Sequence, residues 1–244
     1  MKPKSFVKRA HLLEQKYSYI EMPYCENGDL FGLIEQKDGL VENTARYFSH
    51  QIADAVSYMH DENVVHRDIK LENVVINKEF KAQFIDFGFA VKHDRVDKVE
   101  PSEVTKYGTI TYFPPELLGL ENLVKQKPDL TVSYKKCDMF SLGVLIFQLF
   151  IGRLPFMKAS ATDDHYKFIM NGDWATFWKI HPGKDALNAL SNPSEFKKMI
   201  KKLLTPVPED RLSPQELLAH RFMSQNVEEE DAWADIQATL ALRK

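Results

Sequence analysis

The chain has 244 residues, 44% hydrophobic and 27% charged, which is typical of one globular domain or of two small lobes sharing a core. Its formal net charge of -3 argues against nonspecific binding to nucleic acid. The two cysteines lack a metal-binding spacing, the first residues lack an apolar signal core, and the most apolar stretch, 139–152, is too short to span a bilayer, so we expect a protein of the cytoplasm or the nucleus with no membrane partner.

The first predicted elements are short. A β-type run over 17–22 ends in turn-forming residues, 23–29. A helix then begins at residue 30 with Asp29 as its N-cap, and Asn43 caps a longer amphipathic helix. The apolar residues of this second helix follow helical spacing: Ala45, Phe48, Ile52, Ala55, Val56 and Met59. Short β runs are expected around a polar octet within 63–77 and again at 84–85.

The remainder of the chain is predicted to be a long loop followed by helices. Residues 88–116 show no period, and loops of this length in a compact domain are usually functional or mobile. From about residue 226 the chain is acidic and then helical, which predicts a tail packed outside the domain. The helices expected from composition and period cover 137–151, 166–170, 193–204, 214–220 and 232–242.

The polar octet reads His66-Arg67-Asp68-Ile69-Lys70-Leu71-Glu72-Asn73, and Asp86-Phe87-Gly88 begins thirteen residues after Asn73. Two carboxylates, a lysine and an asparagine at this spacing are what phosphoryl transfer from Mg-ATP requires. The sequence resembles the catalytic half of a eukaryotic-type protein kinase. The resemblance implies an α+β, protein-kinase-like fold, mainly the helical C-terminal lobe.

The resemblance assigns the transfer chemistry to four residues. Asp68 accepts or orients the proton of the substrate hydroxyl, and Lys70 neutralises the transferred phosphoryl group. Asn73 and Asp86 hold Mg2+, a hard cation that prefers oxygen ligands. Lys70, two residues after Asp68, is similar to the serine/threonine kinases.

The segment Ile20 to Phe31 resembles the hinge of these kinases and the helix that follows it. By this resemblance Met22 is the gatekeeper, and ATP binds through the carbonyl of Pro23 and the N–H of Cys25. Proline is tolerated at the first position because only a carbonyl is needed there. Val75 then forms the apolar floor under the adenine ring.

Other residues are implied to support this chemistry. Glu116 is expected to form a buried pair with Arg211, and Asp138 to anchor the backbone of the catalytic loop. His66 packs against Phe87 of Asp-Phe-Gly88, so its role is structural. The structural set is His66, Phe87, Gly88, Glu116, Asp138 and Arg211.

Regulation and substrate choice also follow from the resemblance. Arg67 beside Asp68 implies a cation that waits for a phosphate on the activation segment, and Thr105 sits at the matching position. Ser102 is a weaker candidate, and an unmodified surface threonine remains an alternative. Thr109 is expected to contact Asp68 and Lys70.

Asp29 and Glu72 fall where related kinases bind arginines before the acceptor, so protein substrates with basic residues before the acceptor are expected, together with an upstream activating kinase. The sequences Gly-Asp-Leu-Phe, Asp-Phe-Gly-Phe-Ala and Leu-Leu-Ala-His-Arg-Phe are similar to the calcium/calmodulin-dependent and AMP-activated kinase-like group.

The expected layout has a gap at its start. Residues 1–22 contain no glycine and hence no glycine-rich phosphate loop, so we expect only the last two strands of the N-terminal lobe there. Two functions stay open: a serine/threonine kinase, or a catalytically inactive truncated lobe that acts as a protein-binding module. The expected segments are a lobe remnant at 1–22, a hinge at 23–29, the C-terminal lobe at 30–224 with the activation segment at 86–116, and a tail at 225–244.

Overall fold

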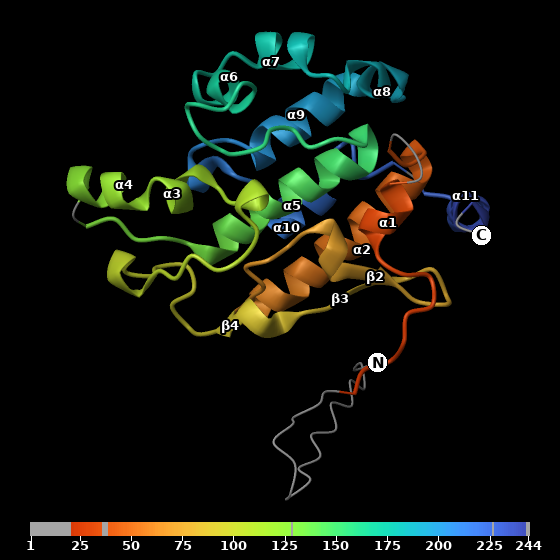
Figure 1. The fold of residues 1–244 in the computed structure, drawn as a ribbon, viewed down its shortest axis with the longest axis horizontal. Coiled ribbons are helices and arrows are strands. Elements are labelled where there is room, and N and C mark those ends of the chain that lie inside the picture. Colours follow the sequence, from red (N-terminus) through yellow and green to blue (C-terminus); the bar gives the residue numbers. More distant parts are fainter. Residues whose placement is uncertain (1–20, 36–38, 128, 226, 243–244) are drawn as a thin grey trace, which may run out of the picture.

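The computed structural model describes residues 21–35, 39–127, 129–225 and 227–242, and it is mainly helical (Figure 1). The strands lie along one edge of the molecule, and α6, α7 and α8 lie at the opposite end. The helices are α1 (Leu30–Ile34), α2 (Glu42–Asp61), α3 (Pro115–Leu118), α4 (Leu120–Gln126), α5 (Tyr134–Ile151), α6 (Tyr166–Met170), α7 (Trp174–Ile180), α8 (Lys184–Ala189), α9 (Pro193–Leu203), α10 (Pro214–Leu218) and α11 (Glu229–Ala241).

Helix α5 is the pillar of the fold because it is apolar on almost every side. All its residues except Lys135 and Lys136 are buried, as expected for a helix enclosed by other elements. Ser133 caps its start, and Gly152 closes its end in the left-handed conformation (φ 73°). A Cβ at Gly143 would lie 2.7 Å from the Cβ of Leu203, so this glycine allows α9 to approach α5 closely.

Two small antiparallel sheets flank the catalytic octet. Strands β2 (Val74–Ile76) and β3 (Ala82–Phe84) pair Val74 with Phe84 and Val75 with Gln83. Strands β1 (Val64–Val65) and β4 (Val91–Lys92) pair on the other side. The octet therefore starts at the end of one sheet and Asp86 follows the end of the other, which brings these two distant motifs together.

The buried side chains form two clusters. The first surrounds α5 and includes α2 and α9. The second, here called the activation-segment core, packs residues of that segment against the start of α5 and the chain before it. Its buried members are Val65, Val96, Phe113, Leu117, Leu120, Val132, Tyr134 and Cys137.

Several sequence predictions differ from the structure at element boundaries. Val41, not Asn43, occupies the N-cap of α2, and the Asn43 amide donates instead to the carbonyl of Glu228. The expected loop 88–116 contains β4 and short 3₁₀ turns, and α3 begins inside it. Helices α4, α7 and α8 were not predicted because they are short and lack a clear period.

The prediction that the tail packs outside the domain is wrong for its helix. Ala232, Ile236 and Thr239 of α11 are fully buried, and the first two join the main core. Most of the predicted remnant of the N-terminal lobe, residues 1–20, lies outside the described residues, and residues 21–22 form no strand. Within the described ranges, the structure contains no helix with the length and hydropathy needed to cross a bilayer.

Candidate active site

The catalytic loop, residues 66–73, is fixed between α2 and α5 by the buried carboxylate of Asp138. Its Oδ1 accepts a hydrogen bond from the backbone N–H of Arg67 at 2.9 Å, and its Oδ2 accepts from the N–H of His66 at 2.8 Å. Nε2 of His60 on α2 lies 3.2 Å from Oδ2. Arg67 has a φ of 65°, a conformation that costs a non-glycine residue free energy. Asp138 thus holds a turn that the loop would not favour alone.

Asp68 is the centre of a compact polar cluster and is 5% exposed. The Thr109 hydroxyl donates to its Oδ1 at 2.8 Å, and Nζ of Lys70 lies 2.8 Å from its Oδ2. Nζ also donates to the Thr109 hydroxyl at 2.9 Å, while the Asn73 amide donates to Oδ2 at 2.9 Å. The structure therefore brings together Asp68, Lys70 and Asn73, three of the four residues to which the transfer chemistry was assigned. Thr109 joins them through the contacts predicted for it.

The charge of Asp68 is set by these partners. Burial alone raises the pKa of its carboxyl, but hydrogen bonds from Lys70 and Thr109, the Lys70 charge and the Asn73 bond outweigh burial, so the pKa of Asp68 is lower than usual. The ionised carboxylate only accepts hydrogen bonds. It can therefore orient an incoming hydroxyl and receive its proton.

The predicted metal ligands, Asn73 and Asp86, lie at the open end of the β2–β3 hairpin, opposite its turn. The N–H of Ile85 donates to the carbonyl of Asn73 at 2.9 Å, which places Asp86 directly beside Asn73 in the fold. The amide nitrogen of Asn73 also donates to the Asp68 carbonyl at 2.8 Å, so its amide oxygen is the end left for a cation. Asp86 is exposed and adopts a left-handed conformation.

These donors fit Mg2+, because an amide oxygen and a carboxylate are hard ligands and Mg2+ usually keeps several waters or substrate oxygens. No group of three or more histidine, cysteine or acidic side chains in the described part of the chain forms a complete metal cage. A protein site of one amide and one carboxylate would leave the other positions to phosphate and water.

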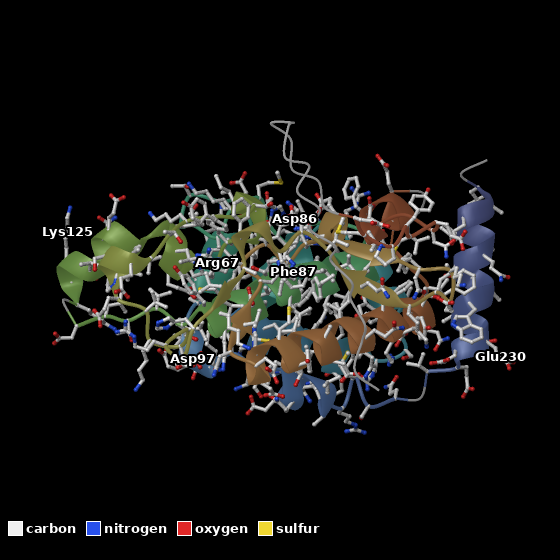
Figure 2. All side chains as sticks on the ribbon, turned by 90° about the horizontal axis from the view of Figure 1, so that it is seen from below. Arg67, Asp86, Phe87, Asp97, Lys125 and Glu230 are labelled. Carbon is white, nitrogen blue, oxygen red and sulfur yellow. The ribbon has the colours of Figure 1, made fainter. Side chains whose placement is uncertain are left out.

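His66 and Asp-Phe-Gly88 pack as a structural unit. The His66 ring lies 4.9 Å from the Phe87 ring and 5.1 Å from the Phe84 ring, measured between centroids. Its Nε2 lies 3.1 Å from the carbonyl of Ile85, and the N–H of Gly88 donates to the Asp86 carboxylate at 3.2 Å. Arg67, Asp86 and Phe87 lie near the middle of the view in Figure 2. The histidine thus orients the strand end that leads to Asp86.

The hinge, residues 23–29, is attached to the β2–β3 hairpin. The N–H of Ile76 donates to the carbonyl of Gly28 at 2.8 Å, and the Cys25 thiol lies 3.7 Å from the amide oxygen of Gln83. Because Gln83 is paired with Val75, the predicted adenine contacts of Cys25 and Val75 lie in one region. Pro23 is exposed, and Met22, the expected gatekeeper, is 61% exposed.

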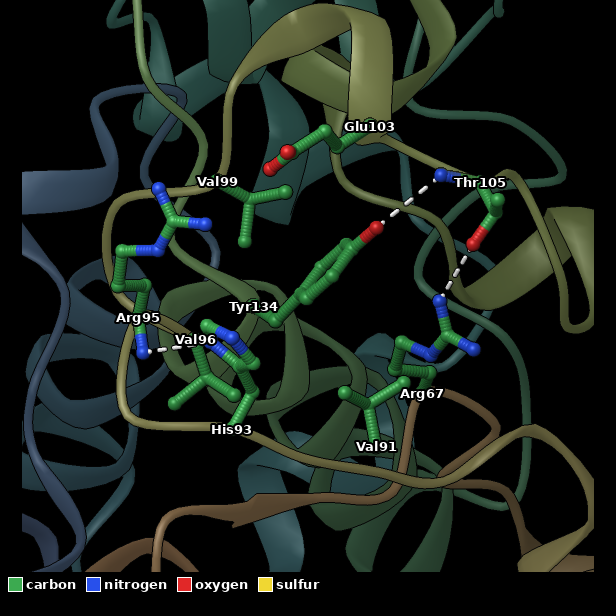
Figure 3. Close-up of a pocket in the computed structure, with 9 residues that line it drawn as sticks. All are labelled: Arg67, Val91, His93, Arg95, Val96, Val99, Glu103, Thr105 and Tyr134. Atoms are coloured by element: carbon green, nitrogen blue, oxygen red, sulfur yellow. Dashed lines mark hydrogen bonds between the residues drawn. The ribbon is translucent and has the colours of Figure 1, made fainter.

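Arg67 joins the catalytic loop to the activation segment. Its Nη1 donates to the Thr105 hydroxyl and its Nε to the Phe89 carbonyl, both at 2.6 Å. These contacts border a cavity of about 300 Å³ that also contains Arg95 and His93 (Figure 3). The predicted partners Arg67 and Thr105 are therefore in direct contact, and Arg95, His93 and Glu103 line the same cavity.

The far end of the activation segment is fastened by the predicted ion pair. The two terminal nitrogens of Arg211 donate to the two carboxylate oxygens of Glu116 at 2.6 and 2.7 Å. Arg211 is 1% exposed, so this bidentate pair is shielded from water. The Cys137 thiol donates to the same carboxylate at 3.6 Å, and burial together with Glu116 raises the pKa of that thiol.

The two predicted substrate carboxylates, Asp29 and Glu72, are not bonded to each other, but helix α1, which Asp29 caps, packs against the turn 71–73 that contains Glu72. Asp29 caps α1, and its Oδ1 accepts from the N–H of Gly32 at 2.7 Å. Glu72 is exposed within the catalytic loop. Asp29 therefore has a structural role in addition to the one expected from the sequence.

Comparison with known proteins agrees with this geometry. Residues 4–223 match the family model described as the protein kinase domain, which is most of the chain. The chain belongs to the protein kinase family. Members of this family in general use ATP and Mg2+, which suits the oxygen donors of Asn73 and Asp86.

The relatives of this kinase domain include several serine/threonine kinases. It is 31% identical to the serine/threonine-protein kinase PKH1 of Saccharomyces cerevisiae, over 89% of this chain and 27% of that protein. It is also 31% identical to serine/threonine-protein kinase 33 of Bos taurus, over 90% of this chain and 44% of that protein. The maternal embryonic leucine zipper kinase of Xenopus tropicalis is 31% identical over 85% of this chain and 28% of that protein.

The chain spans less than half the length of these curated relatives. These relatives are differently named kinases with the same identity to this chain. The resemblance to the calcium/calmodulin-dependent and AMP-activated group therefore stays a prediction. The assignment to serine/threonine protein kinases agrees with the relatives and with the Lys70–Thr109 contact.

Tyr134 is a site residue of this kinase domain that sequence reasoning missed. Its hydroxyl accepts from the N–H of Thr105 at 3.1 Å, and its ring lies 5.1 Å from the Arg67 guanidinium. Tyr134 lies four residues before Asp138 on α5, so both face the catalytic loop. That spacing from a predicted anchor was the signal that could have identified it.

Proposed function

We propose that this chain transfers the γ-phosphate of ATP to serine or threonine hydroxyls of protein substrates. The observation that carries the proposal is the shared contact of Lys70 and Thr109 with the buried carboxylate of Asp68. An ionised acceptor beside a fixed cation is suited to a reaction in which a hydroxyl loses a proton as it attacks phosphorus.

In this mechanism, the substrate hydroxyl donates a hydrogen bond to Asp68, which aligns the hydroxyl oxygen for attack. Asp68 receives the proton as the bond from that oxygen to the γ-phosphorus forms and the bond from the γ-phosphorus to the bridging oxygen of ATP breaks, so that ADP leaves. Lys70 stabilises the negative charge on the transferred group. Asn73 and Asp86 would hold Mg2+, which would neutralise negative charge at the phosphates. The bonds from Thr109 and Asn73 keep the Asp68 carboxylate in one orientation, so little reorganisation is needed during transfer.

ATP binding is proposed to use the backbone of the hinge. The carbonyl of Pro23 and the N–H of Cys25 recognise the adenine edge, Met22 is the gatekeeper, and Val75 packs under the ring. The bonds from the hinge to β2 and β3 support this, because they fix the hinge relative to Val75.

A substrate with basic residues before the acceptor is proposed to meet Asp29 and Glu72. Glu72 is exposed one residue before Asn73, so a cation reaching it would lie beside the transfer site. The capping bond of Asp29 uses one carboxylate oxygen, and the other suffices for a guanidinium.

Phosphorylation of Thr105 by an upstream kinase is proposed to regulate transfer. A phosphate there would replace one hydroxyl contact of Arg67 by charge-assisted bonds, with Arg95 and His93 lining the same cavity. We expect the activation segment to become more ordered as a result.

The test is transfer of labelled γ-phosphate from Mg-ATP to a serine peptide with arginines before the acceptor. We expect signal from the wild-type chain and none from Asp86→Asn. An Asp86→Asn signal equal to wild type would contradict the site. No transfer by a folded wild type would favour the alternative, a kinase lobe that acts as a protein-binding module.

A further inference from the structure

The C-terminal helix α11 packs on the side of the molecule that carries the hinge. Its buried residues face α2, and the Thr44 hydroxyl of α2 donates to Asp235 at 2.9 Å. Helix α11 also contacts α1, which follows the hinge directly. Figure 2 shows α11 at the edge of the molecule, with Glu230 in its first turn.

One group of contacts connects α11 to the tip of the β2–β3 hairpin. Nζ of Lys81 lies 3.0 Å from the Glu229 carboxylate and 5.8 Å from the centre of the Trp233 ring. The Trp233 ring also lies 6.4 Å from that of Phe80, and its indole N–H donates to the Tyr47 hydroxyl at 3.0 Å. The hairpin tip is thus held between α2 and α11.

The same hairpin tip holds the hinge on its other side. Asn77 accepts on its side-chain oxygen from the N–H groups of Glu79 and Lys81, which shapes the turn. Its backbone carbonyl accepts from the Asn27 amide at 2.7 Å, one residue before the Gly28 carbonyl that bonds to Ile76. A continuous set of contacts therefore runs from Trp233 through Phe80, Lys81 and the turn to the hinge.

We propose that α11, through Trp233 and Lys81, positions the hinge for nucleotide binding, and that Trp233 is a positioning residue for ATP. The proposal rests on the function proposed above only for the identity of the ligand. Trp233 touches neither the hinge nor the transfer cluster in this structure, so its effect is expected on nucleotide affinity and not on the transfer step.

The residues of α11 differ in burial. Ile236 and Ala232 are fully buried in the core, whereas Trp233 is partly buried at the edge of the core, and Trp233 and Glu229 reach the hairpin tip. Loosening the tip would release the Asn27 and Gly28 bonds while leaving the core intact. Local openings of this kind involve few buried contacts and leave global unfolding unchanged.

The experiment uses the full chain and the variants Trp233→Ala and Lys81→Ala, with Trp233→Phe as the conservative variant. Thr44→Val is the matched control, because it removes the hydroxyl bond of α2 to α11, which does not involve the hairpin tip. The readouts are amide exchange at Ile76, whose N–H bonds to Gly28, the reaction rate of the Cys25 thiol, and the KM for ATP. The thiol reading is specific because Cys137 is buried.

We expect Trp233→Ala to speed exchange at Ile76 and modification of Cys25 by about fivefold, and to raise the KM for ATP about tenfold with kcat within about twofold. Lys81→Ala should change the three readouts in the same direction. Trp233→Phe should stay closer to the wild type, because it keeps an aromatic ring at this position. Thr44→Val should lower the melting temperature without changing the three readouts.

Equal changes of the three readouts in Thr44→Val and Trp233→Ala at matched stability would overturn the proposal, since the effect would then be a general loosening of α11. Unchanged Ile76 exchange and Cys25 reactivity in both Trp233→Ala and Lys81→Ala would also overturn it. If the wild type binds no ATP, the proposed function fails, yet amide exchange and thiol reactivity still decide whether α11 holds the hinge.

Discussion

The catalytic loop and the activation segment differ in how their polar groups are held. In the catalytic loop, Asp68 and Asn73 are buried and bonded to several partners, and Asp138 fixes the backbone beneath them. In the middle of the activation segment, Thr105 and Tyr107 are exposed, and the side chain of Arg67 reaches this part through its bonds to Thr105 and Phe89. The first region keeps one geometry, whereas the second can exchange its partners.

This difference suits the two proposed tasks. Transfer requires groups that do not reorganise, which burial and multiple bonds provide. A regulated segment requires a small free-energy difference between its states, which exposed contacts provide. Arg67 belongs to both regions, since its backbone bonds to Asp138 and its side chain reaches Thr105.

The largest expected effect is on the rigid region. Asp68→Asn should reduce turnover about a thousandfold, because a neutral amide cannot receive the hydroxyl proton. Steady-state phosphate transfer measures this change, and thermal unfolding should show an intact fold. Glu121→Gln on the exposed helix α4 is the control, with turnover equal to wild type. Full activity of Asp68→Asn would remove Asp68 from the reaction.

Breaking the buried end of the activation segment should have the next largest effect. Arg211→Ala leaves Glu116 buried without its partner and should lower the free energy of unfolding by about 3 to 5 kcal/mol. Urea unfolding of both proteins measures the difference. The double variant Arg211→Met, Glu116→Leu should lose less, because no buried charge remains. A loss below about 1 kcal/mol in Arg211→Ala would contradict the importance of this pair.

The exposed part of the segment should respond more weakly. Arg67→Lys keeps the charge but cannot donate from a planar fork to both Phe89 and Thr105, so the segment should open more often. We expect chymotryptic cleavage at Phe89 and Tyr107 to speed up about fivefold. Lys106→Gln, which alters an exposed lysine of the same segment, is the control. Equal cleavage of Arg67→Lys and wild type would show that the activation-segment core alone keeps the segment closed.

The smallest expected effect is the pH dependence of stability that His181 causes, and this residue lies outside both the catalytic loop and the activation segment. Burial lowers the pKa of His181 below its usual 6.5, the Leu154 carbonyl opposes this shift, and the charges of His165 and Arg153 add to it. The unfolded state therefore binds a proton first as pH falls below 6.5, so stability decreases through that range. Asp68, whose pKa is lowered, stays ionised there.

Unfolding at pH 7 and at more acidic values measures this dependence. His181→Asn should be less stable at pH 7 but should show a shallower decline, by at most about 1.4 kcal/mol per pH unit, the value for one proton. A slope identical to wild type would assign the decline to other groups, such as His220, whose pKa burial also lowers.

The motifs alone predicted the catalytic loop because its residues are close in sequence and their types are dictated by phosphoryl-transfer chemistry. The helical period likewise indicated α2 and α9, whose apolar residues recur at fixed intervals, and a nearly continuous apolar run indicated α5. The pairing of Glu116 with Arg211 followed from family resemblance, and their hydrogen bonds agree with it.

The sequence by itself determined the local chemistry: which residues can accept a proton, carry positive charge or offer oxygen to a cation, and which segments have a helical period. Only the tertiary structure decided that Tyr134 supports Thr105, that α11 joins the core, and that Trp233 reaches the hairpin beside the hinge. These contacts join residues far apart in the chain, and no period or spacing specifies them. They arise because folding packs the elements around α5, and that packing selects which distant side chains meet.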